Sequence, residues 1–476
     1  MLDIRHIVGA VLLFVTGLIK LINESKDFYE IEKGVHELCQ KVCNQILTWV
    51  LGQMDERLMR ERDRSIWEVV GFRVKTAIST FGEFVYKRRL YRNKKTGETK
   101  FFLDEVLGWP ARARITPRLK ELVVRLSSEL SFARAAEVLS RLAPGISAMT
   151  IWQAAQEVGE VLQQEGRKKR AAVFEDGEAP GGKEVASELC IEADGVVIRL
   201  QRAKERRGEI KHIVAYEGKE QIERNRFTLK NKLVLSGLGE SEAVWEECYA
   251  EIGGKWDLSR TERIYIGGDG AEWPKQGLEY FPGAEYRLDP YHLSKHLIEA
   301  LGHEEEVLGK VAAAISRGSW EEVQSILTEA AKGARGNRRK KIIGLLRYLR
   351  ENWEGIIASP ETKRLGAIEG QIYHNLARRM KRLGARWSIS GGDRMARILA
   401  AKANGELGNY TLRWPVEQEK LKELTQTKPM EKRKAEDVEE WLRASLPALR
   451  GPYASRPWVK HVLRELARPD YAALFC

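Results

Sequence analysis

The sequence predicts a mixed α/β protein. Its β-sheet carries helices on both faces, contains an all-helical insertion and follows a helical and β-hairpin N-terminal region. Apolar residues recur at helical spacing over residues 31–58, which predicts one long amphipathic helix. From residue 186, short apolar runs follow one another and then alternate with helical segments, as in a mixed sheet covered by helices. Residues 293–360 show helical periodicity throughout.

The length, net charge and cysteine count of the chain indicate its broad class. A chain of 476 residues is long enough for several domains. Lys and Arg total 80 against 68 Asp and Glu, a formal charge of +12. This excess favours a polyanionic partner, because neutralised phosphates release counterions. Five cysteines, an odd number in a long chain, argue against a disulfide framework and for a reducing cytosol.

Residues 1–70 are expected to form an N-terminal helical region. The apolar run over 7–19 is shorter than the roughly 20 residues that a membrane-spanning helix needs, and no cleavage site of small residues follows it. We therefore expect a buried or partner-facing helix and no stable membrane association, with peripheral membrane contact as the alternative. The stripe over 31–58 suits core packing or pairing with a second copy, so a homodimer or higher homo-oligomer is expected.

Residues 71–110 are expected to form a β-hairpin module or small meander, because residue types alternate over 74–78 and over 84–88 and residues 93–97 supply a turn. The second strand carries a run of cations interleaved with tyrosines, including Lys87, Arg88 and Arg89. These cations either keep a solvated edge strand from pairing with another chain or contact DNA phosphates as part of a β-ribbon. The pattern leaves both interpretations open.

Residues 111–165 are expected to form a helix-turn-helix DNA-binding domain. The helices are predicted over 117–126, over 132–142 and from 148 or 149 to 162, with Ser147 as an N-cap. The last helix would read the major groove, although a helical hairpin of this kind also occurs within protein cores. Residues 166–185 are polar and are expected to form a linker.

Residues 186–292 are expected to form the first part of the sheet-containing core. Strands are predicted over 189–193, 196–200, 210–216, 227–235, 263–267 and 285–288, and helices over 241–252, over 273–280 and from 289 onward. Asp194 and Asp269 each come just after a predicted buried strand and beside a glycine. A desolvated carboxylate must be paired or bind metal, and Mg²⁺ favours oxygen ligands. Two such strand ends could hold a pair of Mg²⁺ ions for phosphodiester chemistry, with a third acid from elsewhere.

The third acid is expected to be Glu369, at the start of a helix in residues 361–412, the second part of the core. A glutamate there also suits the positive end of a helix without any further role, and Glu192 and Asp393 are rival candidates. Cations downstream would contact phosphates. They are Arg378, Arg379, Lys381 and Arg382. Residues 293–360 are expected to form the helical insertion, whose basic run over 337–341 is either a solvated turn or a phosphate contact. Residues 413–476 are expected to form a helical tail.

Four motifs carry a resemblance to a known family. EADG at Asp194, GGDGAEW at Asp269, LDPYHLSKH at Asp289 and GAIEGQIYHNLARRMKRLGARWS at Glu369 resemble a bacterial DDE insertion-sequence transposase of the ISLre-type family. That family was formerly catalogued as an uncharacterised protein family and is related to the Mutator-like transposases. The resemblance runs from about residue 30 to the C-terminus. It implies an RNase H-like fold with a helical insertion before the third acid. It also implies an Asp-x-x-His element, which Asp289 and His292 fill, and His292 could position the scissile phosphate or a metal-bound water.

The function expected from these features is DNA transposition. Asp194, Asp269 and Glu369 would hold two Mg²⁺ ions, with Mn²⁺ able to substitute. The N-terminal region would bind double-stranded DNA at the ends of the element. Hydrolysis at each end would free a 3′-hydroxyl, which would then attack target DNA at the same site. A cytoplasmic, nucleoid-associated location in a bacterium follows from this function. The alternatives are an RNase H-like nuclease or junction resolvase, and a non-catalytic DNA-binding regulator.

Overall fold

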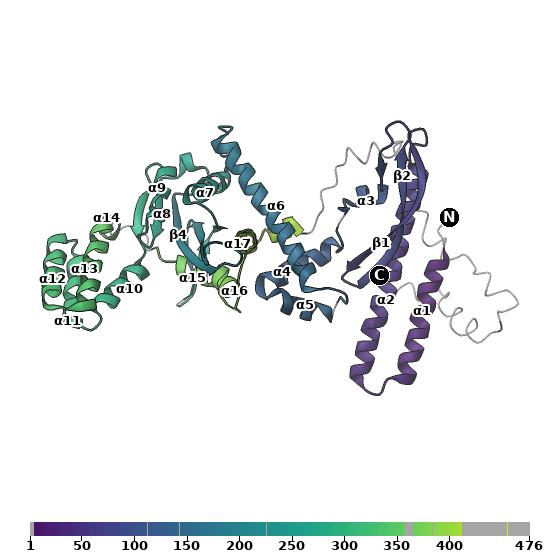
Figure 1. The fold of residues 1–476 in the computed structure, drawn as a ribbon, viewed down its shortest axis with the longest axis horizontal. Helices are drawn as coiled ribbons and strands as arrows, with labels where there is room; N and C mark the ends of the chain where they lie inside the picture. Colours follow the sequence, from purple (N-terminus) through teal and green to yellow (C-terminus); the bar gives the residue numbers. More distant parts are fainter. Residues whose placement is uncertain are drawn as a thin grey trace.

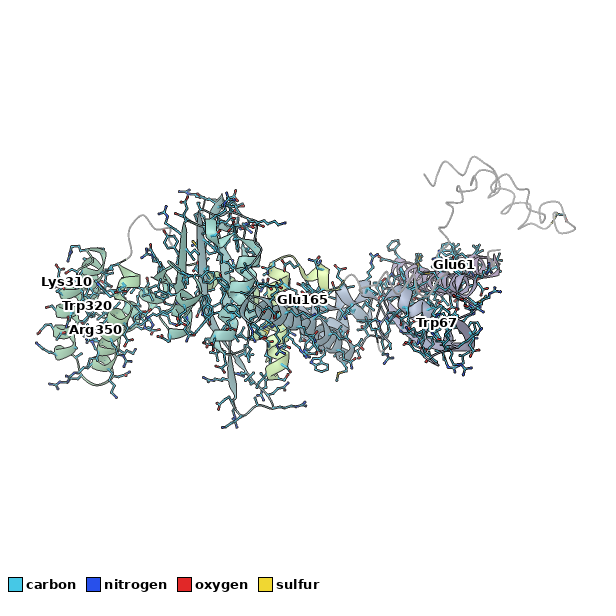
Figure 2. All side chains as sticks on the ribbon, turned by 90° about the horizontal axis from the view of Figure 1, so that it is seen from above. Glu61, Trp67, Glu165, Lys310, Trp320 and Arg350 are labelled. Carbon is cyan, nitrogen blue, oxygen red and sulfur yellow. The ribbon has the colours of Figure 1, made fainter. Side chains whose placement is uncertain are left out.

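The computed structural model describes residues 4–411 except 112, 142, 225, 358–364 and 383, together with residue 455. The described chain is elongated, with a helical hairpin and a β-ribbon at one end, the larger sheet in the middle and a helical lobe at the other end (Figure 1). A view turned by 90° shows the same order, with Trp67 at one end and Trp320 at the other (Figure 2). Residue 455 apart, the predicted tail over 413–476 lies outside the described residues.

The N-terminal region joins a helical hairpin to a small antiparallel sheet. Helices α1 (Ile4–Glu24) and α2 (Phe28–Glu61) pack against each other, and the Asp27 side chain caps α2 by accepting a hydrogen bond from the Glu30 N–H. The sheet has the order β1-β2-β3, which confirms the predicted hairpin. Its elements are β1 (Trp67–Ser79), β2 (Gly82–Asn93) and β3 (Thr99–Lys100), followed by α3 (Phe102–Leu107). Among the helices of the described part of the chain, none is long and apolar enough to cross a membrane.

Helices α4 (Pro117–Glu129), α5 (Phe132–Ser140) and α6 (Ala148–Phe174) confirm the predicted helical segment, and Ser147 caps α6 by accepting from the Thr150 N–H. Two corrections follow. Helix α6 continues through the first half of the predicted linker, because the Lys169 ammonium pairs with Glu251 at 2.8 Å and thereby ties the helix to the core. Buried residues of α4–α6 also belong to the same apolar core as the larger sheet, so these helices do not form a core of their own.

The larger sheet has the strand order β10-β9-β4-β5-β8. Strands β4 (Glu188–Arg199), β5 (Arg207–Tyr216) and β8 (Leu233–Gly237) are antiparallel neighbours, whereas β9 (Arg263–Gly268) and β10 (Glu285–Leu288) run parallel to β4. A separate hairpin, β6 (Gly218–Glu223) and β7 (Arg226–Lys230), lies between β5 and β8 along the chain.

Helices cover both faces of this sheet, as the sequence predicted. One face packs against α4–α6 and the C-terminal helices α15 (Ile368–Ile372), α16 (Arg378–Met380) and α17 (Ile389–Ala403). The turn η2 (Tyr373–Ala377), a stretch of π-helix, joins α15 to α16, and α18 (Leu407–Thr411) follows α17. The other face packs against α7 (Ser241–Lys255), α8 (Glu272–Lys275) and α9 (Gly277–Tyr280). The short helix η1 (Leu258–Arg260) leads into β9.

The predicted all-helical insertion is confirmed and has its own apolar core. It contains α10 (Pro290–Leu301), α11 (Glu305–Ser316), α12 (Trp320–Gly333), α13 (Gly336–Glu351) and α14 (Trp353–Ile356). Val323 and Leu327 of α12 and Leu345 of α13 are buried together, as their helical spacing predicted. The lobe therefore leaves the sheet after β10 and returns the chain to it before α15.

Candidate metal centre

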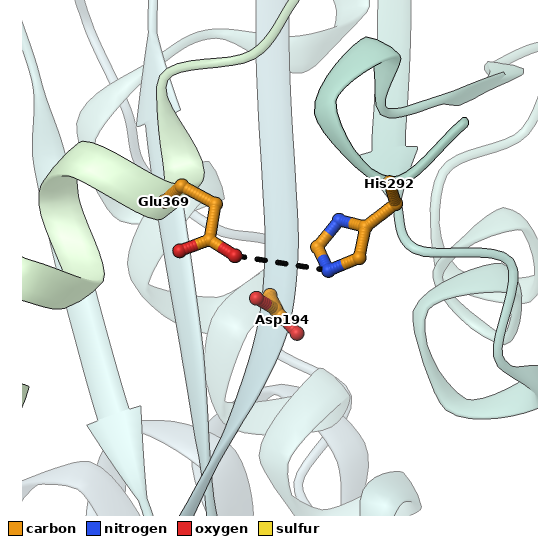
Figure 3. Close-up of side chains that lie close together, drawn as sticks. All are labelled: Asp194, His292 and Glu369. Atoms are coloured by element: carbon orange, nitrogen blue, oxygen red, sulfur yellow. Dashed lines mark ion pairs between the residues drawn. The ribbon is translucent and has the colours of Figure 1, made fainter. Parts of the chain in front are cut away.

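Three side chains that are far apart in the sequence meet beside the larger sheet. Asp194 comes from β4, His292 from the first turn of α10 and Glu369 from the first turn of α15 (Figure 3). Each offers one ligand atom, and these atoms all lie within 4.8 Å of one another. His292 Nε2 is 3.8 Å from Glu369 Oε1. Several donor atoms therefore converge from separate elements, and the group could hold a metal ion.

Asp269, the remaining predicted acid, lies beside this group without belonging to it. It follows the last residue of β9, where the sequence predicted it. On the parallel strands β4 and β9, Glu192 pairs with Gly267, so Asp194 and Asp269 each lie two residues further in the same direction. The carboxylate of Asp269 accepts a hydrogen bond from the Ala271 N–H at 2.9 Å. The two aspartates are therefore adjacent along the same sheet edge.

The position predicted for Asp194 was wrong in one respect. It lies inside β4 and not at a strand end, because the antiparallel ladder with β5 continues through it and pairs Asp194 with His212. The Gly195 N–H donates to the Asp194 carboxylate at 2.6 Å. The parallel partner β9 ends earlier, with Gly268, and this leaves the edge on that side open beside Asp194.

Burial and clustered negative charge act together on Asp194. Burial, with smaller contributions from the carboxylates of Asp269 and Glu369, raises the pKa of its carboxyl to about 6, although the Gly195 hydrogen bond and the charge of His292 act in the opposite direction. A carboxylate that is costly to ionise among other carboxylates is stabilised when a cation neutralises the group. The electrostatics of the site therefore favour a bound cation.

His292 is held by a buried acid. Its Nδ1 lies 2.7 Å from Oδ2 of Asp289, the N-cap of α10, which is only 1% exposed. The hydrogen bond to Asp289 raises the pKa of His292, with the charges of Asp194 and Asp289 adding to it and burial opposing it. The ring is thus oriented by one nitrogen and presents the other to the acids (Figure 3).

The helical insertion holds the loop that carries Asp269. The Tyr348 hydroxyl on α13 donates to the Asp269 carbonyl oxygen at 2.8 Å, and the Gly270 N–H donates to the Tyr286 hydroxyl at 3.0 Å. Gly270 has φ +93°, and a Cβ atom there would lie 2.9 Å from the side chain of Asn352. A glycine is required at this position both by its backbone conformation and by the approach of Asn352.

The rival acid Glu192 has a different role. Its carboxylate is 1% exposed and accepts hydrogen bonds from the backbone N–H groups of Gly366 at 2.8 Å, Ala367 at 2.9 Å and Ile368 at 3.3 Å, and from the Tyr216 hydroxyl. These donors include the first turn of α15. Glu192 therefore joins the strand of the first acid to the helix of the third.

The other rival, Asp393, lies in a separate network. One of its oxygens accepts from the Leu238 N–H at 2.8 Å, and the other accepts from Gln163 at 2.7 Å and from Arg397 at 3.1 Å. Asp393 thus joins α6, the end of β8 and α17. It does not belong to the three-residue group.

Sequence reasoning missed the buried residues beneath Asp194. His212, its neighbour on β5, is fully buried, with Nδ1 2.7 Å from the Ser236 hydroxyl and Nε2 3.5 Å from the Asn375 amide. Burial lowers the pKa of His212 to about 3, so the ring is neutral at ordinary pH. A histidine in the predicted apolar strand over 210–216 was the available signal. Asn375 lies in the π-helical turn η2, a type of distortion that is frequent at functional sites.

The predicted phosphate-contacting cations near Glu369 divide into two classes. Arg378, Lys381 and Arg382 are exposed, and Arg382 donates to the Tyr373 hydroxyl at 3.1 Å. Arg379 is buried, donates to the Ser127 carbonyl at 2.7 Å and lies over the Trp387 ring. The interpretation of Arg379 as a phosphate contact is therefore corrected, because its guanidinium is used inside the protein.

The cations of the β-ribbon divide in the same way. Lys87 is exposed. Arg88 is buried against Asp104 and the Phe101 ring, and Arg89 donates to Asp55 at 2.7 Å. Both arginines connect elements of the N-terminal region, so they are corrected from phosphate contacts to structural residues. The basic run over 337–341 forms the exposed first turns of α13 and is not a turn between helices.

Comparison with known proteins identifies a family that this chain matches. The profile of the Uncharacterised protein family (UPF0236) matches residues 21–418. The chain is similar to the UPF0236 protein TTE2489 of Caldanaerobacter subterraneus subsp. tengcongensis, with 29% identity over 390 residues, 81% of this chain and 80% of the relative. A second relative from the same strain has a name that joins eleven gene labels, and it shows 29% identity over the same shares. The UPF0236 protein in vanSb 3′ region of Streptococcus gallolyticus is 28% identical over 82% of this chain and 86% of its own length.

Proposed function

The chain belongs to the uncharacterised protein family UPF0236, and from this premise and the site geometry we propose that it is a DDE-type DNA transposase. The observation that carries the proposal is the convergence of Asp194 and Glu369 from separate elements, with Asp269 beside them on the sheet edge. Clustered carboxylates of this kind suit the divalent cations used in phosphodiester chemistry.

The sheet supports the finer description of the fold. Three antiparallel strands, β4, β5 and β8, are followed by the two parallel strands β9 and β10 on the other side of β4. Helices lie on both faces, and an all-helical lobe precedes the helix of Glu369. This arrangement agrees with the RNase H-like fold and the inserted lobe that the sequence resemblance implies.

The side chains present fit a divalent cation, the class to which the expected Mg²⁺ and Mn²⁺ belong. Asp194, Asp269 and Glu369 offer carboxylate oxygens, and a bound cation would stabilise the ionised form of Asp194, whose pKa is raised first by burial and then by the neighbouring carboxylates. Two bound ions would stabilise the attacking and leaving oxygens of a phosphodiester displacement. The protein's own contribution is placement: Glu192 fixes the helix of Glu369, Tyr348 fixes the loop of Asp269 and Asp289 orients His292.

One relative supports mobility of the gene. A name that joins eleven gene labels within one strain is what multiple near-identical copies in a genome would produce. Transposition multiplies genes in this way, whereas a nuclease or junction resolvase has no need of such copies. The proposed partners are double-stranded DNA, contacted by exposed cations such as Lys87 and Arg378, and a second copy of the chain.

The test is cleavage and joining by the purified chain. DNA from both flanks of the gene, where the proposal expects inverted repeats, is incubated with protein and Mg²⁺, and a pre-cut end is offered with target DNA. We expect cleavage at the repeats and joining of the freed 3′-hydroxyl. Asp194→Asn, Asp269→Asn and Glu369→Gln should each abolish both reactions and retain DNA binding.

Three results would contradict the proposal. Cleavage without joining would indicate a nuclease or junction resolvase. DNA binding without either reaction would indicate a regulator. Full activity in the three variants would refute the assignment of the acids.

A further inference from the structure

The two ring nitrogens of His292 have different neighbours in the site. Asp289 is 1% exposed, and its Oδ2 lies 2.7 Å from His292 Nδ1. A carboxylate accepts hydrogen bonds and cannot donate them, so Nδ1 carries the proton in this contact, and in the neutral ring that a metal binds Nε2 presents its lone pair. Metal-binding histidines are commonly held in this way, with the second ring nitrogen bonded to a carboxylate.

The free nitrogen is directed at the acids. His292 Nε2 lies 3.8 Å from Glu369 Oε1, and Asp194 completes a group whose ligand atoms lie within 4.8 Å of one another (Figure 3). A cation bonded at about 2.0–2.2 Å to two ligand atoms spans at most about 4.4 Å between them, so the 3.8 Å between His292 Nε2 and Glu369 Oε1 fits one shared cation. Asp269, by contrast, lies next along the sheet edge and does not belong to the three-residue group.

We propose that His292 Nε2 is a direct ligand, and that Asp194, Glu369 and His292 together select a divalent transition-metal cation over Mg²⁺. Mg²⁺ prefers oxygen ligands and retains most of its water, whereas an imidazole nitrogen favours first-row transition metals. Asp289 is a positioning residue for this ligand. The inference deepens the proposed function, since it names the cation chemistry of the same site, and it differs from a role for His292 in holding the scissile phosphate.

The test measures binding of Mn²⁺ alone to the full chain, without DNA. Electron paramagnetic resonance reports free Mn²⁺ during a titration, and competition with Mg²⁺ gives the selectivity. We expect His292→Asn to weaken Mn²⁺ binding about 10–100-fold and to change Mg²⁺ binding much less, and Asp289→Asn to weaken Mn²⁺ binding about 10-fold. His303→Asn is the matched control, because this histidine is exposed in the turn after α10.

A spectroscopic signature separates ligation from an indirect effect. Pulsed resonance of bound Mn²⁺ should show coupling to an imidazole nitrogen in the wild type and in Asp289→Asn, and none in His292→Asn. Circular dichroism checks that each variant is folded.

The proposal is overturned if Mn²⁺ does not bind, if the nitrogen coupling is absent in the wild type, or if His292→Asn weakens Mg²⁺ and Mn²⁺ equally. Nitrogen ligation in a protein that neither cuts nor joins DNA would refute the transposase proposal and leave this inference standing. DNA cleavage without nitrogen ligation would refute this inference and leave the transposase proposal standing.

Discussion

Both carboxylate oxygens of Glu192 accept a hydrogen bond from the backbone N–H of Ala367, at 3.0 and 2.9 Å. Glu192 lies two residues before Asp194 on β4, and Ala367 lies two residues before Glu369. One buried side chain therefore sets the separation between the first and third acids. The site depends on this contact as much as on its ligands.

Replacing Glu192 with Gln should loosen that link. The amide removes one acceptor and the charge, so buried N–H groups at the start of α15 lose partners. We expect a loss of about 1–3 kcal/mol in the free energy of unfolding. We also expect about 10–100-fold weaker cation binding, the range seen when residues that support metal ligands are changed. Urea unfolding and Mn²⁺ titration measure the two effects. Glu220→Gln, at an exposed position on β6, is the control, and equal behaviour of the two variants would contradict the role given to Glu192.

The ionised carboxylate of Asp194 should lower the stability of the fold at neutral pH in the absence of a cation. Its pKa is raised from 3.8 to about 6, so the protonated carboxyl stabilises the fold below pH 3.8, and this contribution is lost as pH rises through about 6. Asp194→Asn resembles the protonated form, so its Tm should exceed that of the wild type at about pH 8 and approach it at about pH 4.

A divalent cation should reverse the order of Tm between the wild type and Asp194→Asn. Added Mn²⁺ binds the folded wild type and raises its Tm, whereas the asparagine variant lacks one charged ligand and should gain much less. Differential scanning calorimetry with and without Mn²⁺ measures this. A wild type that is more stable than Asp194→Asn at about pH 8 without metal would contradict the electrostatic account.

Gly270→Ala should disturb the loop of Asp269. The new Cβ would lie 2.9 Å from the Asn352 side chain, and the backbone has φ +93°, which an alanine rarely adopts. We expect a loss of about 1–3 kcal/mol in stability and a large loss of DNA cleavage. Gly239→Ala, just after β8, is the matched control, because a Cβ atom at that position would meet nothing within 4 Å and the backbone φ is ordinary. Full cleavage by Gly270→Ala would show that the loop tolerates movement.

Arg378 and Arg379 should respond in opposite ways to substitution. Arg378 is exposed, so Arg378→Gln should weaken DNA binding and reduce the slope of log affinity against log salt by about 1, without affecting stability. Arg379 is buried against Ser127 and Trp387, so Arg379→Gln should lower the free energy of unfolding and leave the salt slope unchanged. Fluorescence anisotropy at several salt concentrations and urea unfolding distinguish the two. The reverse pattern would restore Arg379 as a phosphate contact.

Local pattern accounts for what was predicted correctly. The hairpin, the helices from 117 onward, the strand before Asp269 and the helical lobe all follow from periodicity and turn residues, which are properties of neighbouring residues. The errors have tertiary causes. The predicted break after Asp194 is absent because β5 continues the ladder through it, and residues 166–174 are helical because Lys169 pairs with Glu251 on α7.

The amino-acid sequence by itself determined the α/β class, the inserted helical lobe and the short list of acids that could form a site, because these depend on residue type and local spacing. The tertiary structure alone decided which acids meet. The parallel register of β4 with β9 brings Asp269 beside Asp194, the hydrogen bonds of Glu192 bring the helix of Glu369 to β4, and Asp289 turns His292 toward the acids. The contact between Glu192 and Ala367 joins residues 175 positions apart, and no local pattern encodes a distance of that kind.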